Sequence, residues 1–136
     1  MAESPRSRAE GVPPGADYIE LDARKESSAA ARAFVATVIG RTGAHVPDEV
    51  LLLTSEATTN AGLHADSECV TVAVERIGDT IRVSVHDDDP VPPTVMPADP
   101  SRPGGLGVRL IDHIAADWGV EEVIDDGKVV WFEVPL

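Results

Sequence analysis

The chain has 136 residues, of which 43% are apolar and 26% are charged, and its formal net charge is −13. This length predicts one domain, and the composition excludes a collagen-like, coiled-coil or wholly disordered protein. The 24 acidic residues against 11 basic ones disfavour direct nucleic-acid binding, because an acidic surface repels a phosphate backbone.

The cysteine and histidine patterns predict neither a disulfide framework nor a metal cluster. Cys69 is the single cysteine, and the four histidines show no pair at ligand spacing. No apolar run approaches the ~20 residues that span a bilayer, and the N-terminus lacks the apolar core of a signal peptide. We therefore expect a protein of the reducing cytoplasm without a membrane partner.

The N-terminal half of the chain predicts a tail, a strand and an Ala-rich helix. Residues 1–16 are rich in Pro, Ser, Arg, Glu and Gly, so we expect a disordered tail and a folded domain over 17–136. A short strand is predicted at 18–21, and a helix from about residue 27 to 42 that Gly43 ends. The apolar face of this helix is expected to be formed by Ala30, Phe34, Val38 and Ile39. Ser27 or Ser28 is expected to cap its N-terminus.

A second helix and a β-hairpin follow. The helix starts near Pro47 and runs to about residue 64. Its apolar stripe is formed by Val50, Leu53, Ala57 and Ala61. The period then changes to two over residues 70–75 and 81–86, with a turn at Gly78 and Asp79, which is a strong hairpin signal. Residues 87–105 contain six prolines and no periodicity, and this predicts a long loop of functional or disordered character.

The remaining segments complete the predicted fold. A third helix is expected from about residue 106 to 116, followed by strands at 118–124 and 128–134 with a turn between them. Strands joined by tight turns imply a mixed, mostly antiparallel sheet, and the helices are expected on one of its faces. The prediction is an α+β, two-layer sandwich.

Two polar residues on the second helix form the first candidate site. Glu56 and Asn60 are four residues apart, so they lie one above the other on a single helix face. Asn disfavours helix interiors, and its amide oxygen can coordinate a hard cation while a neighbouring Glu accepts a proton. The same pattern is also common on exposed polar faces.

Two further features have chemical potential. Asp87 follows the apolar strand at 81–85, and its carboxylate can accept hydrogen bonds from an amino group such as that of adenine; a turn-forming aspartate is the alternative. Gly104, Gly105 and Gly107 open the third helix, where glycine permits close approach and the helix N-terminus favours anions. A flexible hinge is the alternative for this cluster.

Taken together and in this order, the segments resemble the Bergerat-fold (GHKL) ATPases, the superfamily of gyrase B, histidine kinases and anti-sigma factor kinases. The asparagine box of that superfamily resembles SEATTNAGLHA (55–65), and its first glycine box resembles VSVHDDDP (83–90). Its second glycine box and terminal strand resemble GGLGVRLIDHIAADWGV (104–120) and GKVVWFEVPL (127–136). The resemblance covers the chain after the tail and is closest to short, stand-alone bacterial anti-sigma factor serine/threonine kinases.

This resemblance implies ATP and Mg²⁺ as cofactors. Asn60 would hold the Mg²⁺ that bridges the ATP phosphates, Glu56 would be the general base, and Asp87 would bind the adenine amino group. The residues that would close on the phosphates are Gly105, Leu106 and Gly107. His64 could also face the phosphates, and a core or surface role for it is equally open. The implied partners are a sigma factor and an anti-anti-sigma antagonist protein, with a homodimer as the implied assembly.

Some positions depart from the family pattern and keep other functions open. Asp89 and Val91 stand where the first glycine box usually has glycines, and Val129 and Val130 stand where relatives often carry a threonine near adenine. The leading prediction is a regulatory kinase that transfers phosphate from ATP to a serine or threonine of the antagonist. The alternatives are a non-catalytic nucleotide- or protein-binding module and, less well supported, a detached histidine-kinase catalytic domain, because no helix with a phospho-accepting histidine precedes the domain.

Overall fold

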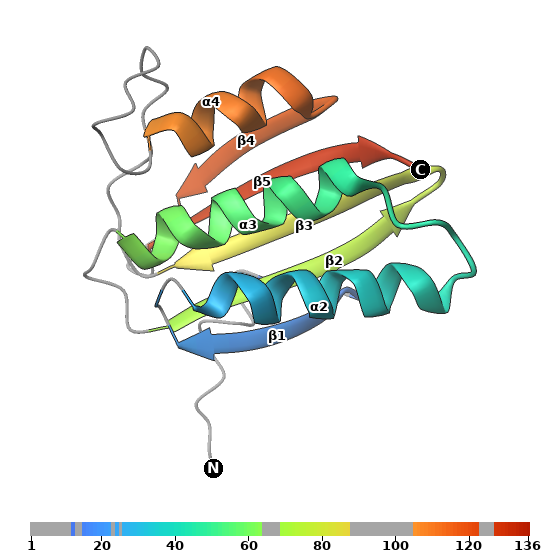
Figure 1. The fold of residues 1–136 in the computed structure, drawn as a ribbon, viewed down its shortest axis with the longest axis horizontal. Helices are drawn as coiled ribbons and strands as arrows, with labels where there is room; N and C mark the ends of the chain where they lie inside the picture. The colour runs from blue at the N-terminus through green and yellow to red at the C-terminus, as the bar shows by residue number, and fades with distance from the viewer. Residues whose placement is uncertain are drawn as a thin grey trace.

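In a computed structural model, the chain forms a five-stranded sheet with its described helices packed against one face (Figure 1). The structure describes residues 12, 15–22, 24, 26–63, 69–87, 105–122 and 127–136. Its elements are β1 (Asp17–Asp22), α2 (Ser27–Arg41), α3 (Asp48–Leu63), β2 (Cys69–Ile77), β3 (Thr80–Asp87), α4 (Gly105–Ile114), β4 (Asp117–Glu122) and β5 (Lys128–Pro135). The predicted two-layer α+β fold is confirmed.

The order of the strands in the sheet is β1-β2-β3-β5-β4. All four described pairings are antiparallel. Because β5 pairs with both β3 and β4, these two strands run parallel to each other, and the segment that contains α4 connects them across β5. The position of β5 between β3 and β4 is therefore a property of the topology that the chain order does not reveal.

The core lies between the sheet and the helix layer. Alternate residues of β2, β3 and β5 point to this face, as the period-two pattern requires. The most buried of them are Val70, Val72, Val74, Val83, Val85 and Phe132. The predicted apolar stripe of α3 is confirmed, because Val50, Leu53, Ala57 and Ala61 are all buried.

The N-terminal half of α2 differs from the prediction. Ala30 is exposed, and the buried face is formed by Ala31, Val35, Val38 and Ile39. The predicted serine cap is wrong: Glu26 occupies the N-cap position without a side-chain cap bond, and the Ser27 hydroxyl donates instead to the Asp22 carbonyl of β1. At the other end, Gly43 adopts a φ of 82° and ends the helix as predicted.

Several predicted segments lie outside the described residues. These are most of the tail at 1–16, the loop between residues 87 and 105, the turn at 125–126, and His64. In the part of the chain that the structure describes, no helix is long and apolar enough to cross a membrane.

Candidate functional site

The two flanks of α3 carry different polar side chains. Arg32 of α2 donates a hydrogen bond to the Ser55 hydroxyl, so the Ser55 flank faces α2. At 100° per residue, Glu56 and Asn60 lie on the other flank. Figure 1 shows α3 between α2 and α4, and α3 packs against both. The predicted pair therefore lies on the side of α3 that faces α4.

Asn60 is buried without a hydrogen-bond partner among the described residues. Its exposed fraction is 8%, and no described group donates to or accepts from its amide. The other buried polar side chains of α3 differ, because Thr54 and Thr58 donate to backbone carbonyls one turn earlier, each at 2.7 Å. A buried polar group without a partner costs about 1–3 kcal/mol, so Asn60 is in the state expected of a ligand-binding amide.

Glu56 lies one turn before Asn60 and is half-buried. Within the described part of the chain its carboxylate forms no ion pair or hydrogen bond. Like the Asn60 amide, the Glu56 carboxylate therefore remains available to bind a ligand or accept a proton, because no described residue pairs with it. The helix places both residues on one face, and their roles as general base and metal ligand stay predictions.

Asp87 is buried in an ion pair with Lys128. The two residues face each other across the β3–β5 ladder, and the Lys128 Nζ lies 2.9 Å from the Asp87 Oδ1. The side chain of Lys128 is 4% exposed and that of Asp87 is 3% exposed. Both lie on the helix-covered face of the sheet, two residues from Val85 and Val130, so the pair closes the end of the apolar core. Asp87 is the last residue of β3, and residues 88–90, with which it would form the alternative turn, lie outside the described residues.

Sequence reasoning did not identify Lys128 as a site residue. A signal was present, because Lys128 precedes Val130, Phe132 and Val134 at a period of two, and this places it on the core face of its strand. A lysine at such a position requires a buried partner.

The elements that carry the described site residues end or begin on the same side of the molecule. β3 ends at Asp87, β5 begins at Lys128, and α3 ends three residues after Asn60; α4 begins at Gly105 on the same side of the molecule (Figure 1). Gly105, Leu106 and Gly107 form the first turn of α4, which presents backbone N–H groups and the positive end of the helix dipole. Their side-chain surroundings, like His64, lie outside the described residues.

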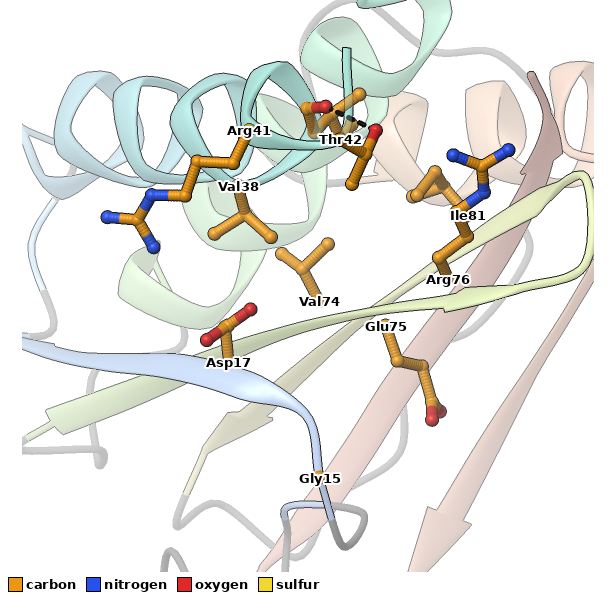
Figure 2. A pocket seen from close by; sticks show the side chains of 10 residues that line it. Gly15, Asp17, Val38, Arg41, Thr42, Val74, Glu75, Arg76 and Ile81 are labelled. Atoms are coloured by element: carbon orange, nitrogen blue, oxygen red, sulfur yellow. Dashed lines mark hydrogen bonds between the residues drawn. The ribbon is translucent and has the colours of Figure 1, made fainter. Parts of the chain in front are cut away.

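A separate cavity of about 350 Å³ lies at the opposite end of the sheet, between the end of α2 and the strands β1, β2 and β3. Its lining includes Asp17, Val38, Arg41, Val74 and Arg76. Figure 2 shows that the Arg41 side chain extends away from the apolar pair formed by Val38 and Val74. None of the predicted site residues lines this cavity, so it is distinct from the candidate site.

The candidate site suits a magnesium ion that is coordinated mostly by phosphate oxygens and water rather than by protein side chains. The described residues contain no group of three or more His, Cys, Asp or Glu side chains that could hold a metal. Mg²⁺ in nucleotide sites is commonly bound by one or two protein oxygens together with phosphate oxygens and water. The partnerless, buried amide oxygen of Asn60 suits this kind of coordination.

Comparisons with known proteins show the family of this chain. No curated protein matches the chain significantly. A solved structure that resembles it is the histidine kinase domain from the Erythrobacter litoralis EL346 blue-light activated histidine kinase, with 23% identity and a TM-score of 0.49. The match covers 95% of this chain and 72% of that chain. The family model of the histidine kinase-like ATPase domain matches residues 21–134. This range runs from the end of β1 to the end of β5 and includes all three described helices. The chain belongs to the histidine kinase-like ATPase domain family.

Proposed function

We propose that this domain binds ATP with Mg²⁺ at the sheet end that holds Asn60, Asp87 and the start of α4. The observation that carries the proposal is the buried Asn60 amide, which has no partner among the described residues. In the proposed complex Asn60 coordinates Mg²⁺, the first turn of α4 binds phosphate oxygens through its backbone N–H groups, and Asp87 accepts a hydrogen bond from the adenine amino group.

We further propose that the bound ATP serves a serine/threonine kinase of the anti-sigma factor type. Its partners are a sigma factor and a small antagonist protein that carries the phosphorylated hydroxyl, and a homodimer is the proposed assembly. The formal charge of −13 favours association with a basic partner surface through its effect on encounter rate.

In the proposed reaction, the serine or threonine oxygen forms a bond to the γ-phosphorus and the bond from this phosphorus to the β–γ bridging oxygen breaks, which releases ADP. Glu56 accepts the proton of the attacking hydroxyl, because its carboxylate is half-buried, lies one turn from Asn60 and has no partner within the described chain. Magnesium supplies charge neutralisation at the phosphates. Asn60 would hold the metal ion one helical turn from Glu56.

A second candidate is a non-catalytic module of the same fold that binds a nucleotide or a protein as a signalling regulator. The observation in its favour is the presence of Asp89 and Val91 at positions where the first glycine box usually has glycine. Such a module would retain the site at Asn60 but transfer no phosphate.

Glu56→Gln separates these functions. The variant keeps the size of the side chain but removes its proton-accepting capacity, so ATP affinity should stay within about threefold of wild type while phosphate transfer to the antagonist falls by about 10²–10⁴-fold. Both quantities are measured on the same sample, by calorimetric titration and by transfer of the γ-phosphate. If wild type binds ATP but transfers no phosphate to the antagonist protein, the non-catalytic binding module is the correct function. A parallel loss of affinity and rate would place Glu56 in metal or nucleotide binding instead.

A further inference from the structure

Base recognition by Asp87 needs only a carboxylate, but this site also contains a buried lysine that pairs with it. Lys128 directly opposes Asp87 in the β3–β5 register, its Nζ lies 2.9 Å from the carboxylate, and both side chains are at least 96% buried. The neighbours on the same face are Val70, Val85 and Val130. The only described lysine of the chain therefore lies next to the apolar core, beside the proposed base-reading residue.

Stability alone does not account for this arrangement. Two ions lose their hydration on burial, and well-packed neutral residues of similar volume are often as stable or more stable. A second ion pair joins the same two strands on the opposite face, between Arg82 and Glu133 at 2.7 Å. That pair is more exposed, at 29% and 20%, and lies on the face opposite the described helices. Burial and a location in the candidate site thus distinguish the Asp87–Lys128 pair.

The chemistry of a carboxylate explains what a neighbouring ammonium can add. An ionised carboxylate only accepts hydrogen bonds, with capacity for about four, whereas a protonated carboxyl also donates one. Lys128 donates a hydrogen bond to the Asp87 Oδ1 and so fixes the position of this oxygen. A carboxylate held in this way accepts from a 6-amino group and opposes a 6-oxo group, which has no hydrogen to donate.

We propose that Lys128 is a positioning residue for base recognition, and that it gives the site its preference for 6-aminopurine over 6-oxopurine nucleotides by holding the Asp87 carboxylate in a fixed orientation through its hydrogen bond to Oδ1. This inference rests on the proposed nucleotide-binding function. It assigns Lys128 no contact with the phosphates, so the loss of its charge alters base preference selectively.

The test compares the affinities of ATP and ITP, which differ at the 6-position of the purine, by calorimetric titration with Mg²⁺. Wild type should bind ATP at least about tenfold more tightly than ITP, and Lys128→Met should reduce this ratio to below about threefold. Lys128→Arg retains the positive charge and should keep the ratio within about threefold of wild type. Arg82→Met, which breaks the pair on the opposite face of the same strands, is the matched control and should leave the ratio unchanged.

The outcomes separate this inference from the function on which it rests. A wild type that binds neither nucleotide overturns the proposed function. A wild type that binds both equally overturns base reading by Asp87 and Lys128 but leaves nucleotide binding standing. An unchanged ratio in folded Lys128→Met, with both affinities lowered together, gives Lys128 a purely structural role and overturns the inference.

A measurement on wild type covers the case in which Lys128→Met does not fold. The chain has two lysines, Lys25 and Lys128, so ¹⁵N-lysine labelling gives two side-chain signals, and Lys128→Arg assigns them. Saturating ATP should shift the Lys128 Nζ signal, and saturating ITP should shift it less. A Lys128 signal that responds equally to both nucleotides, or to neither, would contradict the proposal.

Discussion

Removal of the Lys128 charge should strongly destabilise the folded protein. Lys128→Met keeps an unbranched side chain but leaves the Asp87 carboxylate buried at 3% exposure. Two unit charges 2.9 Å apart attract by about 6 kcal/mol at an effective dielectric constant near 20, and this attraction offsets the loss of hydration of both ions. Removing one partner of a buried pair costs about 3–5 kcal/mol, a large fraction of the 5–15 kcal/mol that typically stabilises a domain.

Urea unfolding followed by far-ultraviolet circular dichroism measures this loss. With a urea dependence of about 1–3 kcal/mol per molar, the unfolding midpoint of Lys128→Met should fall by about 2 M. The double variant Asp87→Asn/Lys128→Met removes both charges of this pair, so its free energy of unfolding should return to within about 1–2 kcal/mol of wild type. Arg82→Met breaks the half-exposed pair with Glu133 and should cost only about 1 kcal/mol.

Two results would refute this reasoning. A Lys128→Met variant that loses less than about 1 kcal/mol would mean that water solvates the Asp87 carboxylate. A double variant as unstable as the single one would assign the loss to the packing of the lysine stem rather than to the unpaired charge.

Three further substitutions test the remaining parts of the site and the sheet. Asn60→Ala should abolish Mg²⁺-dependent ATP binding, measured by titration with and without Mg²⁺. Its free energy of unfolding should stay within about 1 kcal/mol of wild type or rise, because an amide without a described partner is removed. Equal ATP affinity of the variant and wild type would exclude Asn60 from the site. Wild type should bind ATP at least about tenfold more tightly than GTP, and Asp87→Asn should erode this preference; equal binding of both by wild type would exclude Asp87 as the base reader. Gly119→Ala should lower the free energy of unfolding by about 1–3 kcal/mol, because the added Cβ would lie 2.9 Å from three ring atoms of Trp131; an unchanged urea midpoint would show that β4 shifts freely at this edge.

Periodicity made most of the fold predictable. The stripe of α3 and the alternation of β2 and β3 each repeat several times, so a single ambiguous residue does not alter the interpretation. The face of α2 was less predictable because Ala30 and Ala31 are adjacent and identical, and alanine indicates a buried face only weakly. The cap of α2 was mispredicted because Ser27 bonds a carbonyl of β1, a tertiary partner that competes with the local capping bond.

The candidate site was predictable where its residues are local in sequence. Glu56 and Asn60 share a helix, so their spacing alone fixes their common face. Lys128 and Asp87 are 41 residues apart, and their contact depends on β5 lying next to β3 rather than beside β4 alone. Period two could place Lys128 on the core face, but its partner follows only from the strand order, which the sequence pattern does not specify.

The insertion of β5 between β3 and β4 also bears on how the protein is made. β5 is the last of the five strands to leave the ribosome, yet it carries Phe132, the largest fully buried side chain, and the ammonium that neutralises Asp87. Until it is synthesised, β3 and β4 have no strand to join them, and the emerging chain lacks the ammonium that contacts Asp87 at the end of an open core. Productive folding must therefore wait for the final strand, and a nascent chain stalled before Lys128 should be a substrate for chaperones and proteases rather than a partly active domain.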